Sequence, residues 1–97
     1  MIDLPAEQLD QVRRIVRQHL PDQEVFAFGS RVRGKARKFS DLDLMIRSTA
    51  GVPWKKMADL RESFEESDLP ITVDVVDWSA CSDDFRRVVA AELVRLV

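Results

Sequence analysis

Residues 29–44 read GSRVRGKARKFSDLDL, and a β-strand is predicted at each end of this stretch. Residues 24–28, just before it, are rich in strand-forming side chains, and Gly29 stops that strand. A second strand is expected over residues 41–46, with its leucines and isoleucine on one face. Ser30 is suited to cap a short helix that carries the basic residues in between. The stretch therefore predicts two strands joined by a short basic helix.

Two amphipathic helices are predicted, one before these strands in the sequence and one after them. Residues 5–19 form the first, with Pro5 in its first turn and the inner face Leu9, Val12, Val16 and Leu20. The second covers residues 54–66, after a break at Gly51-Val52-Pro53, and its inner face is Trp54, Met57, Leu60 or Arg61, and Phe64. Both helices would pack an apolar stripe against the sheet.

The remaining elements are a strand and a final helix. The strand is expected over residues 71–76, and Ser82 is suited to cap a helix with acidic residues in its first turn. This helix is expected to run to residue 97, with the inner face Phe85, Val88, Val89, Leu93 and Leu96. The order αβαβαβα predicts an α+β fold, an α/β sandwich in which helices cover a small mixed β-sheet.

The bulk properties exclude several classes of protein. The 97 residues suit a single domain over residues 1–97, and a net charge of −2 argues against strong general nucleic-acid binding. Cys81 is the one cysteine, so no disulfide within the chain is expected. No apolar run approaches the length of a membrane span, and no signal peptide is evident, so a cytoplasmic protein is expected.

The Gly29-Ser30 pair lies where a strand meets the next element. Such a junction presents free backbone N–H groups, which suit a phosphate, and glycine lets the backbone approach it closely. The alternative is a plain turn with a capping serine. The basic residues Arg31, Arg33, Lys35, Arg37 and Lys38 follow, and they are either phosphate contacts or a solvated surface. Either Arg31 or Arg33 is expected to contact phosphate, and the sequence leaves open which of the two does so.

Three aspartates are candidates for a metal site. Asp41 and Asp43 are two residues apart on a predicted strand, so their carboxylates share one face and repel each other. A divalent cation such as Mg²⁺ would compensate that repulsion. Asp74 is a lone charge inside a β-branched run. The competing interpretation of all three is a strand face exposed to water.

Gly-Ser followed after ten residues by Asp-x-Asp is expected by chance about once in a thousand chains of this length. The whole stretch resembles the signature of the nucleotidyltransferase superfamily, which includes DNA polymerase beta and kanamycin nucleotidyltransferase. It is most similar to the stand-alone minimal nucleotidyltransferases, and the resemblance covers nearly the whole chain. No departure from the signature is visible.

The resemblance implies a role for each of these residues. Gly29 and Ser30 would hold the β/γ end of a triphosphate, and Asp41 and Asp43 would bind metal. Asp74 would be the third carboxylate, which binds the metal nearest the acceptor or helps to deprotonate its hydroxyl. Two Mg²⁺ ions would stabilise the attacking and leaving oxygens. Strand parity places Asp74 on the face of the acids, and it leaves Asp77 to cap the turn into Trp78-Ser79.

The resemblance also implies a reaction and a partner. Minimal nucleotidyltransferases often act as antitoxins that transfer AMP from ATP onto a tyrosine of a HEPN-domain ribonuclease toxin. One alternative is a subunit that masks a HEPN partner without catalysis. Another is a subunit of a small-molecule (antibiotic) nucleotidyltransferase, for which this chain has no room to build an acceptor pocket alone. The oligomeric state stays open. His19, Cys81, Trp54 and Trp78 are expected to have structural roles, and the alternative for Trp78, which follows the Asp74 strand, is a place in the wall of the nucleotide pocket.

Overall fold

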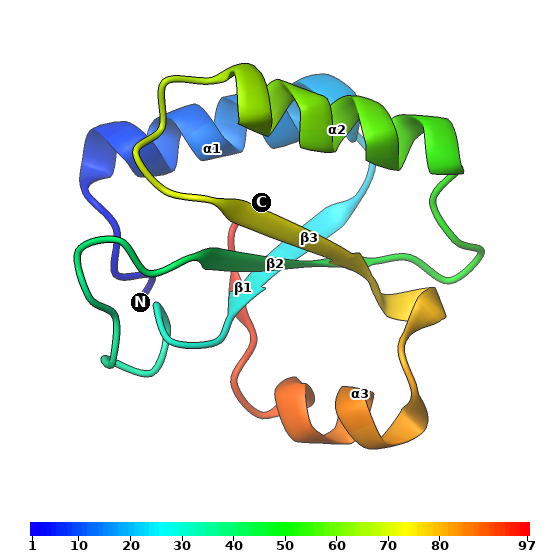
Figure 1. Ribbon diagram of the computed structural model, residues 1–97. Helices are drawn as coiled ribbons and strands as arrows, with labels where there is room; N and C mark the ends of the chain where they lie inside the picture. The colour runs from blue at the N-terminus through cyan, green and yellow to red at the C-terminus, as the bar shows by residue number, and fades with distance from the viewer.

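The computed structural model describes residues 1–97 as helices packed on both faces of one four-stranded sheet (Figure 1). No helix has the length and apolar character that crossing a membrane requires. The elements in chain order are α1 Ala6–His19, β1 Glu24–Phe28, β2 Leu42–Arg47, α2 Trp54–Glu66, β3 Val73–Asp77, a single 3-10 turn η1 Trp78–Ala80, α3 Asp83–Ala90 and β4 Val94–Arg95.

The sheet has the strand order β3-β2-β1-β4 and is mixed, as expected. The strands β1 and β2 pair antiparallel, with Phe28 opposite Asp43. The strands β2 and β3 pair in parallel, with α2 as the crossover between them, and β4 pairs antiparallel with β1. The pairing places the second half of the Asp-x-Asp motif beside both the end of β1 and the strand that carries Asp74.

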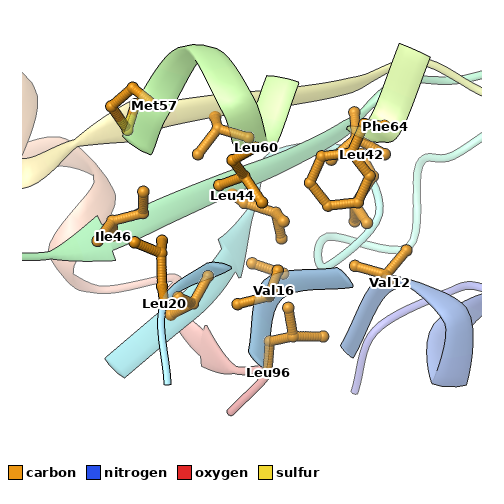
Figure 2. Packing of buried hydrophobic residues seen from close by; sticks show 14 of the residues in the cluster. Val12, Val16, Leu20, Leu42, Leu44, Ile46, Met57, Leu60, Phe64 and Leu96 are labelled. Atoms are coloured by element: carbon orange, nitrogen blue, oxygen red, sulfur yellow. The ribbon is translucent and has the colours of Figure 1, made fainter. Parts of the chain in front are cut away.

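The main core lies between the sheet and the two helices α1 and α2, which cover the same face (Figure 1). Leu42, Leu44 and Ile46 of β2 are completely buried on this face, so their alternation was predicted correctly. Figure 2 shows these side chains facing apolar residues of both helices and Leu20, which directly follows α1; the helix residues are Val12, Val16, Met57, Leu60 and Phe64. Because this face is apolar throughout, charged side chains of the same strands must point to the other face.

Helix α3 covers part of that other face (Figure 1). Met45 of β2 points toward it and is completely buried, and the Phe28 and Phe85 rings meet edge to face with centroids 5.9 Å apart. Ser82 caps α3, as predicted, by accepting a hydrogen bond from the Phe85 N–H. The eight residues of α3 leave the carboxyl end of β1 and the start of β2 and β3 open on this face. This open part of the sheet is where the acidic residues lie.

The helix expected after Ser30 does not form. Residues 30–34 make a turn that is held by the Gly29 and Ser30 carbonyls, and residues 35–41 are irregular. Gly29 and Gly34 both have positive φ, at 84° and 73°, and such residues interrupt a right-handed helix. The prediction of a capping role for Ser30 was therefore wrong, and the basic residues lie on an irregular loop.

The C-terminal segment is also different from its prediction. Helix α3 ends at Ala90, and the chain then turns and adds β4 to the edge of β1, where the Leu96 N–H donates to the Val25 carbonyl. An edge strand with unpaired backbone groups favours this pairing, which local sequence does not reveal. Leu96 is buried as expected, but Val88 is 72% exposed. The observed order is αββαβαβ instead of αβαβαβα.

Smaller differences concern element ends and one tryptophan. Asp41 lies just before β2, and β3 starts two residues later than predicted and includes Asp77. The bounds of α2 match the prediction, but Trp54 at its first position is 81% exposed. The expectation that Trp54 packs into the core was wrong.

Candidate active site

Asp43 and Asp74 lie side by side at the open part of the sheet. They are register partners in the parallel pair of β2 and β3, so their side chains leave the sheet on the same face. Val73 and Val75 are buried on the opposite face while Asp74 is exposed, which confirms the predicted parity of β3. Asp41 is exposed just before β2, close enough for its charge to act on Asp43. The three predicted acids therefore come together.

The surroundings of Asp43 disfavour its charged form. Burial raises the pKa of the Asp43 carboxyl above its usual range, and the negative charges of Asp74 and Asp41 raise it further. The guanidinium of Arg33 acts in the opposite direction, and Glu92 adds another repulsive contribution. The fold thus concentrates negative charge at Asp43, and a bound cation would offset this repulsion.

Gly29 gives the site its close backbone approach. The residue has φ of 84°, and a Cβ atom in its place would collide with the Asp43 carboxylate. Any side chain here would push the acid away, so both the conformation and the space require glycine. Ser30 follows, half-buried, as the first residue of the turn. The Gly-Ser pair and the Asp-x-Asp motif, ten residues apart in sequence, are in direct contact in space.

Arg31 is not directed to the acids. Its side chain is 5% exposed, and its guanidinium donates to the carbonyls of Asp3, Arg37, Lys38 and Ser40 at 2.8–3.3 Å. These bonds tie the N-terminal segment to the loop that leads into Asp41. Arg31 is therefore a structural residue that holds the basic loop in place, and the expected phosphate contact is left to Arg33.

Arg33 is near the acids, and its partner is a residue that sequence reasoning missed. The Arg33 guanidinium is 3.7 Å from the Glu92 carboxylate, whose other oxygen accepts a hydrogen bond of 3.1 Å from the Gly29 N–H. Glu92 lies in the turn between α3 and β4. No local signal marks it, because its position depends on the return of the chain to pair with β1. Sequence analysis had placed it within a helix.

A groove of about 930 Å³ opens beside the acids. Asp43 and Asp74 lie on its wall together with the aromatic residues Phe28, Phe39 and Phe85. It continues along the edge strand β3 toward α2, where the Arg61 guanidinium donates to the Val75 carbonyl. Phe39 is 68% exposed at the rim of the groove. The space is large enough for a substrate and has both charged and aromatic walls.

The acids fit a metal ion that arrives with a ligand better than a resident one. No group of three or more His, Cys, Asp or Glu side chains is arranged so as to hold a metal ion without further ligands. Mg²⁺ usually takes only one or two carboxylates, with water and phosphate oxygens as its remaining ligands. The paired Asp43 and Asp74 offer that smaller set of oxygen donors.

Other residues singled out in the sequence have structural contacts. Asp77 accepts from the Ser79 N–H at 3.0 Å, as predicted, and from the Val52 N–H at 2.7 Å, although it is the last residue of β3 and does not lie beyond it. His19 hydrogen-bonds Ser63, and the Cys81 thiol donates to a backbone carbonyl. Trp78 packs under the Arg86 guanidinium. None of these four side chains lines the groove.

Comparisons with known proteins identify a matching family and a similar protein. The sequence profile of the family described as "Nucleotidyltransferase domain" matches residues 9–96. The probable protein adenylyltransferase MntA of Haemophilus influenzae is 48% identical over 88 residues, which cover 91% of this chain and 77% of that protein.

Solved structures share the fold. A toxin–antitoxin crystallised with AMP-PNP matches with a TM-score of 0.68 at 19% identity, over 92% of this chain and 72% of that one. The toxin–antitoxin MntA-HepT matches with a TM-score of 0.61 at 17% identity, over 94% of this chain and 70% of that one. At these identities the likeness concerns the fold alone.

We expect Arg31 and Arg33 to differ in their effects on stability. The change Arg31→Ala removes a buried guanidinium and leaves four backbone carbonyls without its N–H donors, so it should lower the free energy of unfolding by about 3 kcal/mol. The change Arg33→Ala removes an exposed charge and should cost about 0.5 kcal/mol or less. Urea denaturation of both variants measures the difference, and equal losses would contradict the structural role of Arg31.

The raised pKa of Asp43 predicts that this carboxylate destabilises the fold at neutral pH. The folded state binds the proton more tightly than the unfolded chain, so stability falls as pH rises from the unfolded pKa, 3.8, through the raised folded pKa. The change Asp43→Asn should therefore raise the Tm at pH 7, where a gain of about 1 kcal/mol corresponds to about 4–8 °C.

The stabilisation should shrink when the same thermal scans are made near pH 4, because a larger fraction of wild-type Asp43 is protonated there than at pH 7. Asp68→Asn, a change of a carboxylate that is not among the charges acting on Asp43, is the control. A lower Tm for Asp43→Asn than for wild type at pH 7 would show that Asp43 makes favourable contacts which outweigh the repulsion.

Proposed function

The chain belongs to the nucleotidyltransferase domain family, and we propose that it is a Mg-dependent enzyme that transfers AMP from ATP to a tyrosine hydroxyl of a cognate HEPN-domain toxin. One observation carries the proposal. Asp43 and Asp74 are paired on neighbouring strands beside an open groove, and Asp43 lies directly against the Gly29 backbone. Carboxylates next to a potential phosphate site are what nucleotidyl transfer requires of a protein.

In this proposal each residue has a separate task. Asp43 and Asp74, with Asp41 beside them, would hold the metal together with phosphate oxygens of the nucleotide, and Gly29, Ser30 and Arg33 would hold the triphosphate. The bound Mg²⁺ would neutralise charge on the α-phosphate and on the departing pyrophosphate. The rigid strands β2 and β3 fix the direction of the carboxylates, so the protein contributes mainly position and charge.

The groove supports an acceptor that is part of a macromolecule. It begins at Asp43 and Asp74 and runs along the exposed edge of β3, so a chain segment that lies there can direct a hydroxyl at Asp74. The carboxylate of Asp74 is exposed and is placed to accept the hydroxyl proton. Aromatic walls at Phe39 and Phe85 suit a tyrosine ring.

The relatives support the nature of the partner. The Haemophilus influenzae protein is named a protein adenylyltransferase, and two matching structures are toxin–antitoxin proteins. A subunit that masked its partner without catalysis would gain nothing from carboxylates that repel one another. We therefore favour catalytic neutralisation of the toxin over masking.

The proposal predicts that the purified chain transfers AMP from labelled ATP to the HEPN-type protein encoded beside it. Mass spectrometry should find the mass of AMP on a tyrosine of that partner, and a chelator should abolish the gain. A partner that is neutralised without modification would favour masking, and label that passes only to small molecules would favour a small-molecule enzyme.

Two substitutions in one strand test the assignment of the third carboxylate. Asp74→Asn should abolish transfer and leave the fold and much of the Mg-ATP binding intact, since Asp41 and Asp43 remain. Asp77→Asn should retain transfer within about tenfold, a barrier change of about 1.4 kcal/mol, because Asp77 holds backbone N–H groups. Rates are compared per folded protein, well below each Tm. An active Asp74→Asn with an inactive Asp77→Asn would reverse the assignment.

A further inference from the structure

Glu92 occupies the two positive groups that a phosphate at this site would use. Its carboxylate accepts the Gly29 N–H at 3.1 Å and lies 3.7 Å from the Arg33 guanidinium. The Gly29 amide is next to Asp43, and Arg33 is the basic residue whose charge acts on Asp43. A carboxylate and a phosphate present similar anionic oxygens to such donors. Glu92 thus stands where the triphosphate is expected.

The position of Glu92 is not the one expected for a salt bridge that only stabilises the fold. Its negative charge lies close enough to Asp43 to add to the repulsion there, so this placement works against the fold. The Glu92 side chain is 24% exposed and that of Arg33 is 54% exposed, so water can reach the pair and an entering anion can replace the carboxylate. Arg33 makes no other ion pair.

We propose that Glu92 is a built-in competitor of the triphosphate, which holds the Gly29 N–H and Arg33 until a nucleotide displaces it. This inference rests on the proposed function. Glu92 lies in the turn between α3 and β4, so its side chain can swing out without disturbing either element. The carboxylate keeps both donors oriented and excludes weakly bound anions such as inorganic phosphate. A triphosphate, which carries more charge and brings a metal ion to the aspartates, gains enough contacts to replace it.

The test is the affinity for AMP-PNP with Mg²⁺, measured by titration calorimetry. The change Glu92→Gln keeps an oxygen that can accept the Gly29 N–H but removes the charge. It should tighten binding about three- to tenfold, as expected for the loss of one partly exposed competing ion pair. The matched control is Glu24→Gln, which removes a carboxylate paired with Arg95 at 3.6 Å on the same sheet, and it should leave the affinity unchanged.

A double-mutant cycle separates competition from a merely supporting role. Arg33→Gln should weaken binding at least about threefold more in the Glu92→Gln background than in wild type, because wild-type Arg33 must first give up Glu92. Inorganic phosphate should inhibit binding of the nucleotide only in the Glu92→Gln variant.

The outcomes are distinct. Wild type that binds the nucleotide while Glu92→Gln binds equally or more weakly overturns the competitor role and leaves the proposed function standing. Failure of both proteins to bind overturns the inference together with the proposed function. Binding by Glu92→Gln that exceeds that of wild type, with Glu24→Gln unchanged, supports the inference.

Discussion

The repulsion between Asp43 and Asp74 is the constraint around which the site is organised. Parallel strands with one fully apolar face force both carboxylates to the other face, at neighbouring positions. The core beneath them makes that arrangement stable, because Leu42 and Leu44 flank Asp43 and are completely buried. Burial of the hydrophobic face thus offsets the repulsion between the two carboxylates and keeps them close together. A tightly packed sheet with helices on one side supplies the rigidity, and the open part of its other side supplies access.

Most of the main core was predictable because it follows from local periodicity. The alternation of Leu42, Leu44 and Ile46 and the helical spacing of Val12 and Val16 each reflect a single element. The same holds for Asp74, whose parity within its strand placed it on the face opposite Val73 and Val75. The errors occurred where distant segments meet. Residues 94–97 read as the continuation of a helix because nothing near them indicates that β1 has a free edge.

The two arginines near Ser30 illustrate the same limit at the site. Arg31 and Arg33 are equivalent in sequence, both basic and both two residues or fewer from a glycine or serine. Their different roles come from the turn between them, which directs one guanidinium inward to backbone carbonyls and the other toward Glu92. Since the Asp3 carbonyl that Arg31 contacts and the Glu92 carboxylate that Arg33 contacts are both brought to the turn by tertiary structure, sequence spacing cannot distinguish the two arginines. The buried Arg31 also fixes the irregular loop before Asp41, because its guanidinium donates to three backbone carbonyls of that loop.

The pairing of β4 with β1 has a consequence for synthesis on the ribosome. The backbone groups of Val25 form hydrogen bonds with Leu96 and Val97. One edge of the sheet therefore stays unpaired until almost the whole domain has left the ribosome. Contacts between such distant segments form late and slowly. Helices α1 and α2 can collapse onto β1 and β2 earlier, but Glu92 reaches Gly29 only after the final strand has docked. In a nascent chain, the aspartates and the Gly29 and Arg33 donors would therefore be accessible before Glu92 can bind those donors.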